Sequence, residues 1–164
     1  HVDPRVPFET VDALERGVRA AGYVEIDAVF GTPEGPRVLT ARCPRLELAP
    51  RREIPPDAEL ELELWLRYEG ITVAGFGARI APGCTTTTST DEPTIARRGP
   101  GYDLDALRVC LRRIKNERQF AAERSVRVFA DRRIPWGQVA TVVVAVQRDA
   151  VGPLFSDALF CTSQ

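Results

Sequence analysis

The side chains best able to do chemistry are few and widely spaced in this 164-residue chain. Histidine occurs once, at His1, so a His-based nucleophilic triad has almost no support. The four cysteines form no CxxC pair and have no histidine cluster beside them, which argues against a zinc site. The sequence also lacks a Gly-rich phosphate loop. We therefore expect no enzyme activity, no bound metal and no cofactor.

The cysteines are Cys43, Cys84, Cys110 and Cys161. An even number at this spacing is typical of buried free thiols, or of two disulfides in an oxidising compartment. Counting does not separate the three possible pairings. The cysteines alone leave both the redox state and the connectivity open.

Four aspartates occupy repeated positions in the sequence. Asp3 and Asp131 each precede a Pro-containing helix start, and a functional carboxylate is one interpretation of the repetition. The favoured interpretation is that they cap the first turn of the following helix. Asp27 and Asp157 begin similar strands, where solvent-facing positions are a better interpretation than catalytic acids.

Composition restricts the class of protein. Hydrophobic residues make up 44% and charged residues 27%, which is a soluble globular balance with enough apolar residues for a core. The net charge of −1 argues against nucleic acid as a partner. No run approaches the ~20 apolar residues that cross a bilayer, and the first residues lack a signal-peptide pattern.

Helical spacing of apolar residues predicts helices over 8–21, 104–118 and 136–150, the second with Asp103 as its N-cap. The leucines of "AELELELWLRYEG" alternate with polar residues and predict a half-buried strand, followed by a second strand over 71–80. The stretch "APGCTTTTSTDEPTIARRGPG" is interpreted as a mobile polar surface loop. Further strands are expected over 24–31, 38–40, 125–130 and 155–162. From residue 58 the order β-β-α-β-α-β predicts an α+β two-layer sandwich, with helices on one face of a mixed sheet.

Three aromatic residues are candidates for binding a partner. Trp65 shares a strand face with Glu61 and Glu63, which makes it a candidate for a contact surface. Phe8 and Trp136 each begin a helix, where core packing is the favoured interpretation and a partner-binding anchor is the alternative. Three arginines of the second helix, Arg112, Arg113 and Arg118, are interpreted as a solvated helix face.

The beginning of the chain resembles a segment near its end. "HVDPRVPFETVDALERGVRAAG" aligns with "FADRRIPWGQVATVVVAVQRDA", and "DAVFGT" aligns with "DALFCT". Apolar matches alone would arise between any two strand-turn-helix-strand units, but the shared Asp-x-Arg-apolar-Pro-aromatic element is more specific. We therefore interpret 1–32 as the last helix and strand of a first copy, 33–57 as a Pro-rich linker, and 58–164 as a complete domain.

The repeated element carries a resemblance to a known family. "VRVFADRRIPWGQVATVVVAVQRD" followed by "FSDALFCT" resembles the end of the periplasmic domain of the ExbD/TolR family. In that family a strand ending in Ala-Asp leads through a short Pro-containing turn into a helix and a final strand. The preceding linker, alternating strand, Gly turn and helix are similar to the family pattern as well. The likeness covers roughly 44–164, and 1–32 as a partial second copy.

The resemblance implies a non-enzymatic periplasmic domain of a stator subunit that couples proton flow to work at the envelope. It implies a TolQ/ExbB-like channel subunit as one partner, and a segment of a TonB- or TolA-like protein or peptidoglycan as another. It also implies anchoring to the inner membrane by a helix upstream of His1, and either a homodimer or a pseudo-dimer of the two copies within one chain. In a periplasmic setting we expect the disulfides Cys84–Cys110 and Cys43–Cys161.

Other classes of function remain open at this point. A secreted ligand- or glycan-binding module that shares the small α/β sandwich is the main alternative. An enzyme would need a catalytic group from a region upstream of this sequence. A membrane helix with a buried Asp before His1 would favour the stator interpretation.

Overall fold

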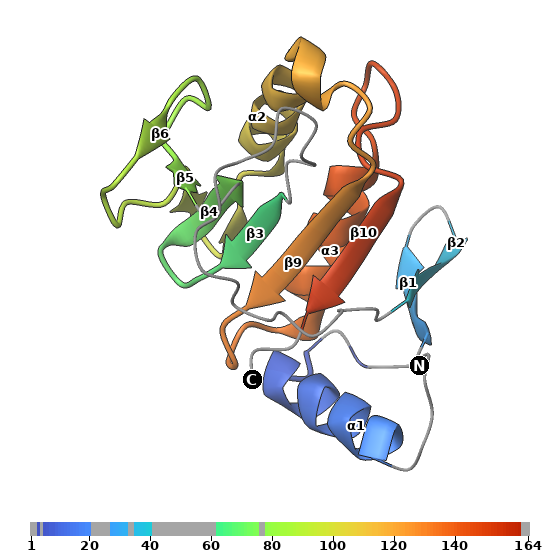
Figure 1. Ribbon diagram of the computed structural model, residues 1–164. Coiled ribbons are helices and arrows are strands. Elements are labelled where there is room, and N and C mark those ends of the chain that lie inside the picture. The colour runs from blue at the N-terminus through green and yellow to red at the C-terminus, as the bar shows by residue number, and fades with distance from the viewer. Residues whose placement is uncertain are drawn as a thin grey trace.

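The computed structural model describes residues 3, 5–20, 27–32, 35–40, 62–75 and 78–161 (Figure 1). The first elements are α1 (Phe8–Ala20), β1 (Asp27–Thr32) and β2 (Gly35–Thr40). Six strands and a helix follow: β3 (Glu63–Leu66), β4 (Gly70–Gly75), β5 (Ala78–Ile80), β6 (Thr87–Thr88), β7 (Ile95–Arg98), β8 (Gly101–Tyr102) and α2 (Leu104–Asn116). The chain continues through a 3₁₀ turn (Arg118–Phe120), β9 (Ser125–Ala130), α3 (Trp136–Gln147) and β10 (Asp157–Cys161).

The main sheet is mixed, with the strand order β10-β9-β3-β4-β5-β6. β9 lies in the middle of a parallel trio, since it pairs in parallel with both β10 and β3. The pairs β3–β4, β4–β5 and β5–β6 are antiparallel, and β7 pairs antiparallel with another part of β4. Helices α2 and α3 lie on the same face of this sheet (Figure 1). The fold is therefore α+β, as the sequence predicts.

The alternation of residues in β3 fixes which side of the sheet faces the helices. Leu64 and Leu66 are buried in the core, while Glu63 and Trp65 lie on the opposite face and are half-buried. Because side chains of a strand point to alternate faces, this register places every leucine of the strand under the helices. A shift by one residue would exchange the two faces.

Helix α2 is amphipathic, and its first turn is capped as the sequence predicts. The side chain of Asp103 accepts a hydrogen bond from the backbone N–H of Ala106 at 2.9 Å. Leu107, Leu111 and Ile114 are buried at helical spacing on the face that meets the core.

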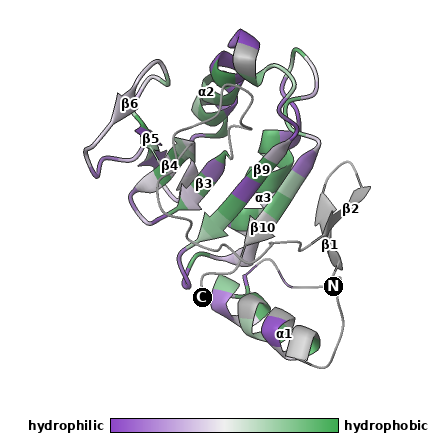
Figure 2. Cartoon of the chain, viewed as in Figure 1, coloured by the Kyte–Doolittle hydropathy of each residue, from purple (hydrophilic) through white to green (hydrophobic). Residues whose placement is uncertain are grey.

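Helix α3 is apolar on nearly every side, and the core surrounds it. Its buried residues are Trp136, Val139, Ala140, Val142, Val143, Ala145 and Val146. The β-branched valines have only modest helix propensity, so burial rather than local preference stabilises this helix. Figure 2 shows the apolar residues concentrated on α3 and on the strands that it covers.

Two expectations about the middle of the chain are wrong. Residues 71–80 do not form one strand, because β4 ends at Gly75 and β5 returns antiparallel with Gly75 opposite Ala78. The segment expected as a mobile polar loop contains β6, β7 and β8, and both Thr94 and Ile95 are buried in it. Strand pairing with β4 and β5 overrides the polar composition of this segment.

The N-terminal elements differ in part from the expected ranges. Helix α1 ends at Ala20, and β1 spans Asp27–Thr32 and pairs antiparallel with β2. Within the expected linker, the strand begins at Gly35 rather than at Val38. In the repeat interpretation β1 corresponds to β10, yet β10 pairs in parallel with β9 whereas β1 forms a hairpin with its neighbour.

Candidate partner-binding surfaces

Trp65 lies on the sheet face that points away from α2 and α3. Its ring stacks on Phe129 of the neighbouring strand, with 4.3 Å between ring centroids and 11° between the planes. The indole N–H of Trp65 donates a hydrogen bond to Glu63 Oε2 at 3.2 Å, and Arg127 pairs with the same carboxylate at 3.8 Å. The candidate contact surface is therefore a stacked pair of aromatic rings with one acidic and one basic side chain beside it. The sequence gives Trp65 but not Phe129, whose position opposite Trp65 follows from the parallel register of β3 and β9.

The structure places the other two aromatic candidates together in the core. Phe8 and Trp136 are each 1% exposed, and their rings stack with 6.1 Å between centroids. Their burial agrees with the core-packing interpretation. In this conformation neither ring is accessible to an outside partner, so Trp65 is the aromatic candidate that keeps an exposed fraction.

The edge strand β10 offers backbone groups to a partner. Of the described strands, only β9 is hydrogen-bonded to β10. The N–H of Asp157 donates to Arg124 O on the β9 side at 2.9 Å. Because successive amides of a strand point to opposite sides, those of Ala158 and Phe160 point away from β9. β2 lies close to β10, and Figure 1 shows the β1–β2 hairpin beside it.

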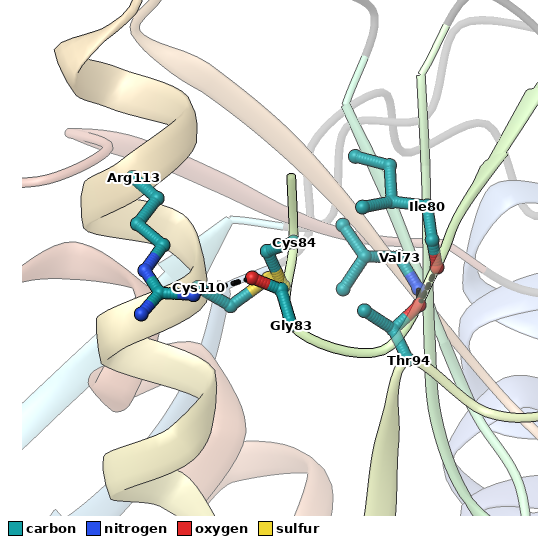
Figure 3. The surroundings of a disulfide bond; sticks show 7 residues. All are labelled: Val73, Ile80, Gly83, Cys84, Thr94, Cys110 and Arg113. Carbon is teal, nitrogen blue, oxygen red and sulfur yellow. Dashed lines mark hydrogen bonds between the residues drawn. A yellow bond between two sulfur atoms is a disulfide. The ribbon is translucent and has the colours of Figure 1, made fainter. Parts of the chain in front are cut away.

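A disulfide joins Cys84 to Cys110, the pair expected for a periplasmic setting. It connects the loop after β5 to helix α2, with 5.3 Å between the two Cα atoms (Figure 3). Arg113, one turn further along α2, donates a hydrogen bond to the carbonyl of Gly83 at 2.5 Å. The loop is therefore held against the helix by a covalent bond and a charge-assisted hydrogen bond. Cys43 and the side chain of Cys161 lie outside the described residues.

Thr94 connects two strands from within the same loop. Its hydroxyl accepts a hydrogen bond from the backbone N–H of Val73 at 2.9 Å and donates one to the carbonyl of Ile80 at 2.6 Å (Figure 3). The side chain thus supplies a bond to β4 and a bond to the last residue of β5. Sequence reasoning missed this residue, because nothing local distinguishes it from the other threonines of the loop.

Helix α2 has a hollow on each side of Val109. One hollow, of about 240 Å³, is lined by the disulfide and by Arg98, and the other, of about 360 Å³, is lined by Val151. Val109 is 54% exposed and Val151 is 80% exposed. The two hollows form an apolar surface. The arginines around it already form salt bridges with acidic side chains or hydrogen bonds with backbone carbonyls.

Arg112 is not a solvated residue, contrary to the interpretation of its helix face. Its guanidinium donates to both carboxylate oxygens of Asp149, at 2.7 and 2.6 Å. The same carboxylate accepts the backbone N–H groups of Val151 and Gly152. The Arg112 hydrogen bonds are the main reason that the pKa of Asp149 lies well below its usual range. This bidentate pair fixes the loop after α3 to α2.

The repeated aspartates do not cap the helices that follow them. Helix α3 has no side-chain cap, and Asp131 is exposed at the end of β9. Asp3 accepts hydrogen bonds from the side chain and the backbone N–H of Arg5, and these lower its pKa to about 2. Asp157 is exposed at the start of β10. No group of three or more His, Cys, Asp or Glu that could hold a metal occurs within the described part of the chain.

None of the helices in the described ranges is long and apolar enough to cross a membrane. Comparison of the chain with models of protein families, with curated proteins and with solved structures finds no match.

Proposed function

We propose that this chain is a non-enzymatic periplasmic domain of an ExbD/TolR-like stator subunit, which binds a partner at the envelope. It would act beside a TolQ/ExbB-like channel subunit and be held at the inner membrane by a helix on the N-terminal side of His1. The energy for its work would come from proton flow through that channel.

One observation carries the proposal. From Ser125 to Cys161 the chain runs through a strand, a Pro-containing turn, a helix and a final strand that pairs in parallel with the first. This is the unit on which the sequence resemblance rests, and it ends in an edge strand. The Cys84–Cys110 disulfide is further support, since disulfides persist in oxidising compartments such as the periplasm.

The physical route that we propose for the partner is strand addition along β10. An extended segment of a TonB- or TolA-like protein would take the place of the β1–β2 hairpin beside β10. It would pair with the outward amides of Ala158 and Phe160, and its affinity would come from main-chain hydrogen bonds. Strand addition needs no deep pocket and no catalytic group. It is therefore compatible with a sequence whose reactive side chains are few and widely spaced.

The first test is co-purification with the TolQ/ExbB-like protein encoded in the same genome, using the chain as its gene encodes it. The stator proposal requires a stable complex, and a gene without a membrane helix before His1 would contradict it. For the β10 edge, overlapping peptides that cover the periplasmic part of the TonB- or TolA-like protein are added to the isotope-labelled chain and followed by NMR. The changes in amide chemical shift are expected to centre on β10.

A pair of variants separates edge pairing from other contacts. Ala158→Pro removes one outward N–H and should abolish peptide binding, whereas Ala158→Gly keeps the N–H and should retain it. Sedimentation with purified peptidoglycan tests the cell wall as the partner. Binding to soluble glycans, without binding to either the channel protein or the peptides, would favour the secreted ligand- or glycan-binding module instead.

A further inference from the structure

Helix α2 exposes an apolar surface to solvent. In the described part of the chain, the large hydrophobic side chains that stay exposed are Leu14, Tyr68, Val109 and Val151. Two of these, Val109 of α2 and Val151 of the loop after α3, line the same hollow of about 360 Å³. Val109 also lines the neighbouring hollow of about 240 Å³. The two hollows together are called the α2 surface below.

Two residues of α2 separate the hollows. Val109 and Arg113 line both of them and lie one helical turn apart. The smaller hollow is also lined by the disulfide and Ile95, and the larger one by Val151. A cavity of about 150 Å³ is enough to hold a benzene ring, so each hollow has room for one large apolar side chain. The α2 surface therefore offers two apolar sites, one on each side of Val109.

Hydrogen bonds hold Val151 in its exposed position. Its N–H donates to Asp149 Oδ1 at 2.9 Å, and Arg112 of α2 donates to both oxygens of the same carboxylate. The N–H of Asp149 donates to the carbonyl of Gly152 at 3.0 Å and closes the turn on which Val151 lies. A valine that an ordered turn keeps in water lacks the stabilisation that burial gives. An apolar ligand that covers this side chain would supply that stabilisation.

The wall of the smaller hollow is fixed as well. The Cys84–Cys110 disulfide joins the loop after β5 to α2, and Arg113 donates a hydrogen bond to Gly83 O at 2.5 Å (Figure 3). Both sides of the α2 surface are thus tied to the helix before any ligand arrives. A preformed site binds its ligand without the entropy cost of ordering its own walls.

The charges around the α2 surface favour an anionic ligand. Three of the four arginines that line the hollows are paired with aspartates: Arg98 with Asp103, Arg108 with Asp105 and Arg112 with Asp149. The fourth, Arg113, bonds a neutral carbonyl, and no acidic partner for it occurs within the described ranges. One positive charge is therefore left for a ligand carboxylate, at the point where the two hollows adjoin.

We propose that the α2 surface binds an acidic peptide segment of another protein, with one apolar side chain in each hollow and a carboxylate paired with Arg113. The apolar side chains supply most of the affinity, and the carboxylate sets the orientation of the segment. The proposal is independent of the proposed stator function. The α2 surface shares no residue with β10, and it binds side chains, whereas strand addition at β10 binds main-chain groups.

Selection from a displayed library of random peptides tests the chemistry of the ligand. The full chain is the target, and peptides that also bind its Val109→Ser/Val151→Ser double variant are removed beforehand. Both side chains are exposed, so the double variant should keep the circular dichroism spectrum of the wild type. Enriched peptides should carry an acidic residue between two apolar ones. No enrichment, or enrichment of peptides that lack either the acidic or the apolar residues, would overturn the proposal.

A synthetic copy of a selected peptide then measures the apolar contribution. Val109→Ser should raise the Kd of this peptide about tenfold or more, because Val109 would lose its contact with an apolar side chain of the ligand. Leu14→Ser is the matched control, since it removes an exposed apolar side chain from α1 and should leave the Kd unchanged. Equal losses of affinity in the two variants would contradict binding at the α2 surface.

The role of Arg113 is tested by changing both partners. Arg113→Gln should weaken binding of the acidic peptide about tenfold, with little effect on a peptide whose acidic residue is replaced by its amide. An equal loss for both peptides would show that Arg113 acts only through the loop at Gly83, and would refute the carboxylate pairing. Light scattering tests whether a second copy of the chain occupies the surface instead. A mass that rises with concentration in the wild type but not in Val109→Ser would overturn the proposal.

Discussion

Replacing Thr94 by Val is expected to remove the bond that joins the loop after β6 to β4 and β5. The two side chains have nearly the same volume, so packing changes little and the loss is almost entirely the hydroxyl. Thr94 is 4% exposed, and its hydroxyl makes one hydrogen bond as acceptor and one as donor. In the variant the N–H of Val73 and the carbonyl of Ile80 both lose their side-chain partner.

The expected cost follows from two buried polar groups. Leaving one buried donor or acceptor unsatisfied costs about 1–3 kcal/mol, and relaxation around the variant makes the second loss smaller than the first. We therefore expect Thr94→Val to lower the free energy of unfolding by about 2–4 kcal/mol. Thr94→Ser keeps the hydroxyl and loses one methyl group, so its cost should be about 1 kcal/mol.

Urea denaturation followed by circular dichroism measures both variants against the wild type, with equal slopes as the check that the unfolded states are comparable. Amide exchange at Val73 gives an independent readout, because that N–H should lose protection in the valine variant alone. If Thr94→Val costs less than Thr94→Ser, the hydroxyl is not the stabilising group and the reasoning fails.

Three further predictions concern the rest of the fold. At neutral pH Asp149→Asn should lower the free energy of unfolding by about 1–3 kcal/mol. Because Arg112 depresses the folded-state pKa of Asp149, the extra stability of the wild type should be full above about pH 4 and shrink as the pH falls. Acid titration of the unfolding free energy of both proteins would measure this. Gly70→Ala would place a Cβ 2.2 Å from the carbonyl oxygen of Ile95 at a φ of +154° and should lower the Tm, while Gly101→Ala has open space and should not. Replacing both disulfide cysteines by alanine removes a cross-link over 26 residues and should cost about 3.5 kcal/mol, and calorimetry showing less than about 1 kcal/mol would refute the chain-entropy account.

Elements with a clear period were predictable from the sequence. The leucine alternation that ends at Leu66 identifies β3, and the helical spacing around Leu107 and Leu111 identifies α2. The order of the predicted helices and strands along the chain is sufficient to assign the α+β fold class. Each signal is local, because a residue and its neighbours three or four positions away determine it.

Features that depend on distant pairing were not predictable. The split between β4 and β5 depends on their antiparallel pairing at Gly75, and β7 depends on its pairing with β4. Arg112 was interpreted as solvated because its partner Asp149 lies on another element. The role of Thr94 was not predictable for the same reason, because it depends on a hydrogen bond with the distant Val73 and not on the residues beside it in the sequence.

For the candidate surface, the sequence identified Trp65 but not its stacking partner. The sequence also identified Phe8 and Trp136 as a repeated pair of positions. It could not show that they meet, because equivalent positions in a repeat need not be neighbours in space. The fold, and not the repeat alone, brings them into contact.

The position of the disulfide also affects how fast the central parallel pair of strands forms. The central parallel pairing joins β3 to β9, so Leu64 must find Val128 across a long intervening chain that contains both Cys84 and Cys110. An oxidised cross-link bypasses 26 residues of that chain and lowers the entropy cost of closing it by about 0.5 kcal/mol. A chain that oxidises before it folds should therefore form its central parallel pair about twice as fast as a reduced one.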